Sequence, residues 1–209
     1  MKNISIVIIL IISTIFSISA QDQYAKGMSK ALGLWGEGKS LEAVALFERI
    51  AQAENDQWLP SYYAANVLIV QSFESAAAAL NDERLKKAEK LIAEAHKRSP
   101  NNSEITTMEG LLYTAYVAMA PETYAMVYSQ KIMELHTKAI ELDPKNPRAH
   151  SNHVEYQMGS ARFFGQDMKQ FCDQLNPIIP LYENQKKEIP FAPFYGLERL
   201  EANIKECGC

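Results

Sequence analysis

Apolar residues recur every three or four positions along most of the chain between residues 24 and 150. Residues 41–53 place four of them on one helical face: Leu41, Val44, Phe47 and Ile50. Residues 82–98 set an apolar face against a face of Glu, Lys and Arg, and Asn81 or Asp82 can cap the first turn. Residues 163–175 and 197–206 read as two further helices. No stretch alternates as a half-buried strand does, so we expect an all-α protein.

Proline marks the edges of these periodic segments. The prolines concerned are Pro60, Pro100, Pro121, Pro144 and Pro147. At the edge of a helix, the missing amide hydrogen and the fixed backbone angle of proline disturb the hydrogen bonding least. Helices joined by such short corners run antiparallel, so we predict antiparallel helix pairs.

Two sets of helix positions repeat along the chain. They are Ala43, Ala88 and Ile132, and Ala65, Gly110 and Val154, with intervals of 45 and 44 residues in each set. A small residue in the middle of a helix lets the partner helix approach closely. Periodicity of this length is typical of a solenoid of stacked units, in which the recurring corners have a structural role.

These segments resemble the tetratricopeptide repeat. Its first helix carries a small residue and an aromatic residue three positions later, as Gly110 and Tyr113 do. Its second helix carries a small–x3–large–x2–small pattern, and a proline follows five positions later. The residues that match this second half are Ala43, Phe47 and Ile50, then Ala88, Ile92 and Ala95, with Pro100 and Pro144 as closing prolines. The resemblance covers roughly residues 24–157 and implies an α-α superhelix.

The repeat unit departs from the family in length. The intervals of 44 and 45 residues exceed the family's unit of about 34 residues. We expect the extra residues to lengthen the helices. Armadillo and HEAT repeats natively have the longer period and are the alternative, but the closing prolines favour the tetratricopeptide interpretation.

The two ends of the chain differ from the repeats. One Lys, an apolar run from Ile4 to Phe16 and small residues up to Ala20 have the layout of a secretory signal. An uncleaved anchor is the alternative, but the run is shorter than the roughly 20 apolar residues of a membrane span. We predict three parts: a signal peptide (1–20), tetratricopeptide-like repeats (21–158) and a C-terminal helical cap (159–209). The protein is expected to be exported to the periplasm or secreted, without membrane insertion once the signal is cleaved.

The charge of the chain limits the classes of partner that it is expected to bind. The chain has 21 Lys and Arg against 25 Asp and Glu, and removal of a signal with one Lys leaves 20 against 25, a net charge of −5. No run of Lys and Arg is present. Nucleic acid and anionic lipid are therefore not expected as partners.

Cysteine is confined to the predicted cap, at Cys172, Cys207 and Cys209. Because an exported protein leaves the reducing cytosol, we expect a disulfide from Cys172 to either Cys207 or Cys209. Two alternatives stay open. The terminal Cys-Gly-Cys could bind a soft metal ion or work in thiol redox chemistry, or the thiols could remain unpaired or pair between molecules.

Catalytic motifs are missing from the sequence. His150 and His153 share a helical face with Glu155 nearby, but the zinc-protease arrangement needs two histidines four apart with a glutamate directly after the first. No nucleophile elbow and no phosphate-binding glycine loop is present. We therefore expect a protein that is not an enzyme and has no metal and no cofactor.

A curved solenoid presents its first helices along a concave surface that binds partners. Carrying the family's groove positions onto this chain gives Tyr62, Asn66, Thr107, Leu111, Thr114, Arg148, Ser151 and Glu155. Asn66 fits the carboxylate-gripping version of that groove, but Tyr62 stands where it has Lys. We predict a non-enzymatic interaction module that binds a peptide or a segment of another envelope protein. The alternative is a metal-binding or thiol-redox protein that acts through the terminal Cys-Gly-Cys.

Overall fold

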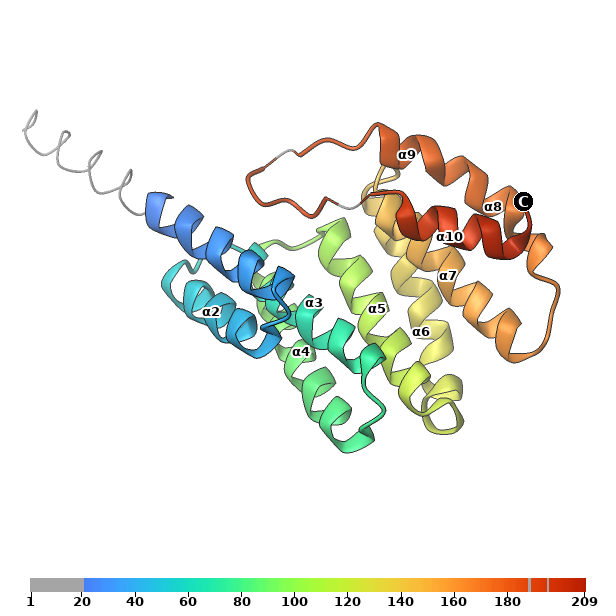
Figure 1. Ribbon diagram of the computed structural model, residues 1–209, viewed down its shortest axis with the longest axis horizontal. Helices are drawn as coiled ribbons and strands as arrows, with labels where there is room; N and C mark the ends of the chain where they lie inside the picture. Colours follow the sequence, from blue (N-terminus) through green and yellow to red (C-terminus); the bar gives the residue numbers. More distant parts are fainter. Residues whose placement is uncertain (1–20, 188, 195) are drawn as a thin grey trace, which may run out of the picture.

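The chain folds entirely into helices joined by turns in the residues that the computed structural model describes, namely 21–187, 189–194 and 196–209 (Figure 1). This confirms the all-α prediction. Residues 21–36 form the first helix. The repeat helices that follow are α2 (Ser40–Ala53), α3 (Leu59–Glu74), α4 (Ala78–Arg98), α5 (Ser103–Met119), α6 (Pro121–Leu142) and α7 (Pro147–Phe163). The predicted signal lies outside the described residues.

The helices stack in chain order as antiparallel pairs (Figure 1). Helix α3 packs on α4, and α5 packs on α6. Each second helix also contacts the next first helix, and the first helices contact one another in the order α3, α5, α7. This arrangement confirms the solenoid, with α3, α5 and α7 side by side.

The repeat positions face the interior of this stack. Ala43, Ala88 and Ile132 have no exposed surface, and Ala65, Gly110 and Val154 are buried as well. The longer repeat unit is found in the second helices, because α4 has 21 residues and α6 has 22, whereas α2 has 14. The regular spacing in the sequence therefore reflects one continuous apolar core.

The start of α4 differs from the prediction. The helix begins at Ala78, several residues before the expected caps Asn81 and Asp82. Ala78 and Ala79 extend the helix upstream because alanine has the highest helix propensity. Asn81 instead donates its side-chain amide to the carbonyl oxygens of Ser72 and Ser75, at 3.1 and 2.7 Å, and so closes the turn between α3 and α4.

The C-terminal cap is built from short pieces. They are the 3-10 turns η1 (Met168–Phe171) and η2 (Asn176–Ile178) and the helices α8 (Cys172–Leu175), α9 (Ile179–Glu183) and α10 (Glu198–Cys207). The single helix expected over 163–175 is wrong, because α7 ends at Phe163 and Gly165 adopts a left-handed backbone (φ 65°). The final helix expected over 197–206 is confirmed by α10. Val154 and Met158 of α7 join residues of the cap in a second apolar cluster.

Residues 184–197 connect α9 to α10, and we call this segment the strap. In Figure 1 it leaves α9, runs back above the first half of the stack and returns to α10. The hydroxyl of Tyr63 in α3 donates to the carbonyl oxygen of Phe191 at 2.8 Å. The Phe191 ring lies edge-on to Tyr24 of the first helix, with centroids 6.0 Å apart. The cap therefore reaches across the first helices as well as closing the end of the solenoid.

In the part of the chain that the structure describes, no helix has both the length and the apolar character that a membrane crossing requires.

Candidate ligand-binding site

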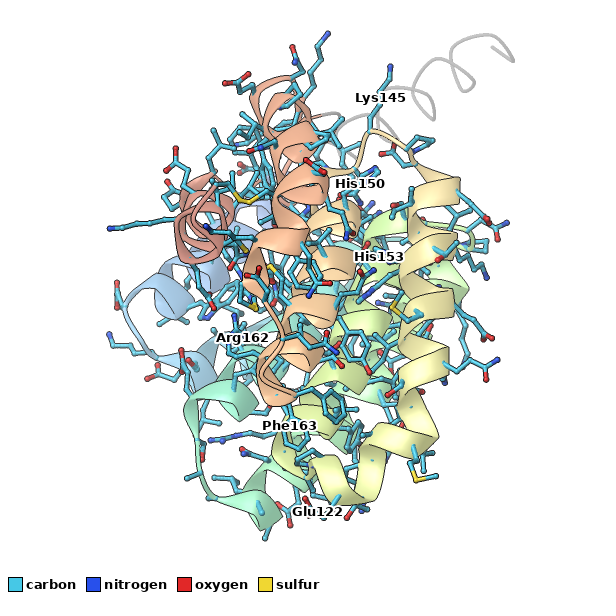
Figure 2. All side chains as sticks on the ribbon, turned by 90° about the vertical axis from the view of Figure 1, so that its right-hand side faces the viewer. Glu122, Lys145, His150, His153, Arg162 and Phe163 are labelled. Atoms are coloured by element: carbon cyan, nitrogen blue, oxygen red, sulfur yellow. A yellow bond between two sulfur atoms is a disulfide. The ribbon has the colours of Figure 1, made fainter. Side chains whose placement is uncertain are left out.

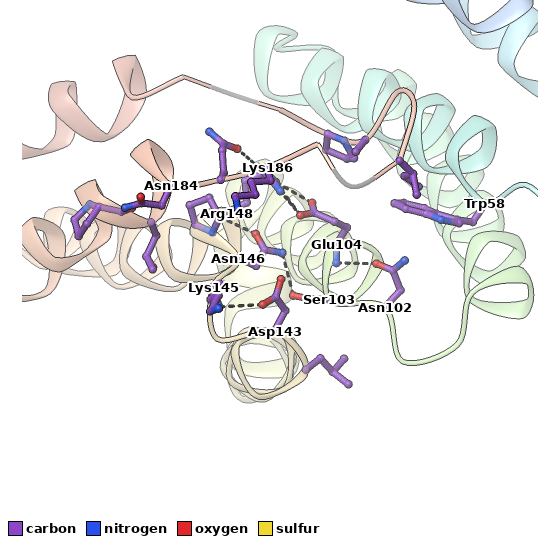
Figure 3. Close-up of a pocket in the computed structure, with 18 residues that line it drawn as sticks. Trp58, Asn102, Ser103, Glu104, Asp143, Lys145, Asn146, Arg148, Asn184 and Lys186 are labelled. Carbon is purple, nitrogen blue, oxygen red and sulfur yellow. Dashed lines mark hydrogen bonds and ion pairs between the residues drawn. The ribbon is translucent and has the colours of Figure 1, made fainter. Parts of the chain in front are cut away.

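A pocket of about 850 Å³ lies where the corners of the solenoid meet the strap (Figure 3). The first helices run parallel to one another, so the N-termini of α3, α5 and α7 gather at one end of the molecule. They form one wall of the pocket, and α9 and the strap form the other. The lining residues are Trp58, Asn102, Ser103, Glu104, Leu142, Asp143, Lys145, Asn146, Pro147, Arg148, Pro180, Leu181, Asn184, Gln185, Lys186, Ile189, Ala192 and Pro193.

Two asparagines shape the helical wall. The Asn102 side-chain oxygen accepts hydrogen bonds from the backbone amides of Glu104 and Ile105, at 2.9 and 3.3 Å, and caps α5. Asn146 caps α7 in the same way. Its amide also donates to the hydroxyl of Ser103 at 2.9 Å, which ties the two corners together. The repeated corner of the sequence thus builds the wall of a pocket.

An ion pair joins α5 to α7 within the helical wall, and the same arginine makes a hydrogen bond to the strap. The Nε atom of Arg148 donates to both carboxylate oxygens of Glu104, at 3.0 and 2.8 Å, and its Nη2 atom also contacts Glu104. Its Nη1 atom donates to the side-chain oxygen of Gln185 at 3.1 Å. The side chains of Arg148 and Glu104 are only 15% and 16% exposed. A bidentate pair of this kind fixes the geometry of both partners, so α5, α7 and the strap are held together here.

The pocket combines an apolar surface with cations. Its apolar residues are Trp58, Leu142, Pro147, Pro180, Leu181, Ile189, Ala192 and Pro193. Lys145 and Lys186 are exposed on its two sides, one from the corner before α7 and one from the strap (Figure 3). The lining also holds two carboxylates, that of Asp143 and that of Glu104, which is paired with Arg148. A pocket of this size, with two exposed lysines beside an apolar surface, suits a small molecule with an apolar body and anionic groups.

Most of the groove positions taken from the family resemblance lie outside the pocket. Tyr62, Asn66, Thr107 and Ser151 are buried, and Leu111, Thr114, Arg148 and Glu155 are half-buried. Of these eight residues, Arg148 lines the pocket.

The groove positions of α7 meet the cap. The hydroxyl of Tyr182 donates to Ser151 at 3.1 Å. Glu155 pairs with Arg199 at 2.6 Å and accepts a hydrogen bond from Asn203 at 2.9 Å. The structure therefore brings these positions together on one surface, and the cap of the same chain packs against that surface.

The groove positions of α3 and α5 contact their own surroundings. The hydroxyl of Tyr62 donates to Glu104 at 3.5 Å. Thr107 and Thr114 donate to backbone oxygens one turn earlier in α5, at 2.8 and 2.9 Å. These hydroxyls stabilise the fold locally.

The histidines lie on another face of α7. His150 and His153 lie one after the other along α7, on the side of that helix next to α6 (Figure 2). The ring of His153 is 6.1 Å from that of the buried His136, measured between centroids. In the described ranges, no group of three or more His, Cys, Asp and Glu side chains could hold a metal ion. Burial lowers the pKa of His136 to about 3, and the neighbouring His153 adds to this effect.

The cysteines take one of the two pairings that the sequence left open. Cys172 and Cys209 form a disulfide with a Cα–Cα distance of 5.5 Å. Cys207 is a buried free thiol, and burial raises its pKa. The disulfide ties the end of the chain to α8.

Trp58, Lys145 and Lys186 were not among the residues singled out from the sequence. The signal that could have found the first two is the corner itself, because Trp58 precedes Pro60 and Lys145 lies between Pro144 and Pro147. These corners stand at equivalent places in the repeats, and equivalent corners of a solenoid lie on one edge. No sequence pattern marks Lys186, because it reaches the pocket through the path of the strap.

Comparison with known proteins supports the fold. No family model and no curated protein matches the chain. Among solved structures, the chain is similar to the HusA haemophore from Porphyromonas gingivalis, with a TM-score of 0.75 and 21% identity over 88% of this chain and 92% of that chain. MamA, residue 41 to the end, from Desulfovibrio magneticus RS-1 aligns with a TM-score of 0.35 and 17% identity over 78% and 98% of the two chains. The first similarity shows a shared helical fold over nearly the whole chain.

Proposed function

We propose that this chain is an exported, non-enzymatic binding protein that holds a tetrapyrrole such as haem in the pocket between the helix N-termini and the strap. The pocket is the observation that carries the proposal. Its volume of about 850 Å³ falls within the roughly 300–1,000 Å³ of small-molecule sites. The similarity to a protein named as a haemophore supports the choice of ligand class.

The chemistry of the pocket suits such a ligand. Haem is a flat apolar ring with two carboxylates at one edge. Trp58 and the prolines of the wall offer flat apolar surfaces for the ring. Lys145 and Lys186 offer cations for the carboxylates, and their exposure makes this attraction sensitive to salt.

The test is a titration of the purified mature protein with haem, followed by the Soret absorbance. We expect saturation at one equivalent. The double variant Lys145→Glu with Lys186→Glu should weaken binding at least tenfold at low salt and less at high salt. Lys90→Glu is the matched control, because Lys90 is exposed on α4 and does not line the pocket. A wild type that shows no saturable binding contradicts the choice of haem, and a double variant that binds normally contradicts the site.

A second candidate function is the binding of a protein segment on the inner surface of the solenoid. One observation favours it: the strap of this chain already lies there, its described residues form neither helix nor strand, and the backbone carbonyl of Phe191 accepts a hydrogen bond from Tyr63. Affinity capture from the envelope fraction tests this function. A specific partner recovered by wild type should be lost from a variant with Arg148→Glu and Glu155→Lys. Retention of the partner by that variant excludes the inner surface as its site.

A further inference from the structure

We infer that the strap is a movable lid over the pocket, which opens by leaving the first helices while the disulfide-bonded cap stays in place. This inference rests on the proposed function and specifies how access to the site is controlled. It is argued from the strap's contacts, its backbone and its two ends.

The strap forms one wall of the pocket together with α9, and several of its described residues lie at the molecular surface. Six of its residues line the pocket: Asn184, Gln185, Lys186, Ile189, Ala192 and Pro193. Its contacts with the repeat helices include the hydrogen bond from Tyr63 to Phe191, the ring contact of Phe191 with Tyr24 and the hydrogen bond from Arg148 to Gln185. Ile189 and Phe194 remain 43% and 49% exposed. A segment whose apolar side chains stay partly exposed opens locally more easily than the core.

The backbone of the closed strap is strained at its main contact. Phe191 has φ 62°, a left-handed conformation that a bulky side chain rarely adopts. Such a conformation persists only where the surroundings hold it. Here Tyr63 holds the carbonyl oxygen of Phe191, and Tyr24 holds its ring. When these two contacts break, Phe191 can relax, so opening releases the strain.

Both ends of the strap are fixed outside it, and at the α9 end the hydroxyl of Tyr182 donates to Ser151 of α7 at 3.1 Å. The disulfide between Cys172 and Cys209 ties α10 to α8. Arg162 of α7 pairs with Glu206 of α10 at 2.7 Å, and Leu200 of α10 is buried in the second apolar cluster. The strap can therefore leave the first helices without unfolding of the cap.

A ligand in the pocket would favour the closed strap. Lys186 belongs to the strap, whereas Lys145 belongs to the corner before α7. When the strap leaves the first helices, Lys186 moves with it, so the closed strap is the arrangement that keeps both cations at the pocket. Because a ligand shifts a conformational equilibrium toward the state it binds better, haem would enter through the open state and stabilise the closed one.

Hydrogen exchange on the full mature protein with its disulfide intact tests the lid. Without ligand, amides of residues 184–194 should exchange at least tenfold faster than those of α5. Tyr63→Phe removes the hydroxyl donor, and Phe191→Ala removes the ring that meets Tyr24. Each variant should speed exchange in the strap severalfold without changing exchange in α10, and each should speed both association and dissociation of haem. Phe194→Ala is the matched control, because that half-exposed ring contacts Lys187 of the same strap.

The outcomes separate the two proposals. The lid proposal is contradicted if amide hydrogen exchange in the strap is as slow as in α5, or if neither variant changes it. Haem binding with rates that neither variant alters also overturns it, although the proposed function then stands. Strap exchange that responds to the variants in a protein that does not bind haem leaves the lid intact and removes the ligand assigned to it.

Discussion

One contact between two residues sets the spacing of α5 and α6. A Cβ atom added to Gly110 would lie 2.5 Å from the Cδ2 and Nε2 atoms of the His136 ring. Any other residue at position 110 therefore pushes the two helices apart or forces the ring to move. This explains why the small position of the repeat is glycine in this pair, whereas Ala65 suffices in the preceding one.

Gly110→Leu is expected to lower the free energy of unfolding by about 1–3 kcal/mol, because overpacking forces the neighbouring helices to shift. Urea unfolding monitored by circular dichroism measures the change. Gly159→Ala in α7 is the control, because a Cβ there meets nothing within 4 Å, and it should leave stability unchanged or increase it. A Gly110→Leu variant as stable as wild type would show that the contact with His136 does not limit the helix spacing.

His136 should make stability depend on pH. In the folded protein burial lowers its pKa to about 3, from an ordinary value of 6.5. Below pH 6.5 the unfolded chain binds a proton that the folded protein does not. The contribution of neutral His136 to the free energy of unfolding is therefore complete above pH 6.5 and is lost as the pH falls toward 3. At pH 5 the loss relative to pH 8 should be about 2 kcal/mol. Urea unfolding across this range measures it, and His136→Leu should remove most of the slope. An equal slope in that variant would contradict the assignment.

At the scale of helices, the sequence predicted most where the interactions are local. Apolar spacing and proline positions located the repeat helices, because both act within a few residues. The cap was predicted less well: the helix over 163–175 is broken near Gly165, and the strap contact joins Tyr63 to Phe191, which are 128 residues apart. Lys186 reaches the pocket through the strap, so the sequence predicted Arg148 as a binding residue but gave no indication of Lys186.

The disulfide should stabilise the cap. It closes a loop with a sequence separation of 37 residues, and a loop of this length is typically worth about 2–4 kcal/mol. Cys172→Ser should lower the free energy of unfolding by about that amount, measured by urea unfolding. Cys207→Ala is the control, because Cys207 lies outside the disulfide, and its effect should be clearly smaller. Equal effects of the two variants, or free thiols at all three cysteines in the protein purified without reductant, would contradict the assigned pairing.

At the scale of the whole molecule, the solenoid is partly closed by its own C-terminal segment. The cap covers the inner face of α7, while the strap leaves a pocket at the helix N-termini. The inner surface of the solenoid is thus reduced to a pocket of small-molecule size. Under the proposed function, the pocket below the closed strap suits a small ligand better than a long peptide.

The most direct test of this account is a crystal structure of the mature protein saturated with haem. We predict one ring in the pocket, against Trp58 and the strap, with its carboxylates within reach of Lys145 and Lys186. The result that would contradict the account is an empty pocket with the ring bound elsewhere. The exposed pair Phe163 and Phe164, at the other end of α7 (Figure 2), offers such a place.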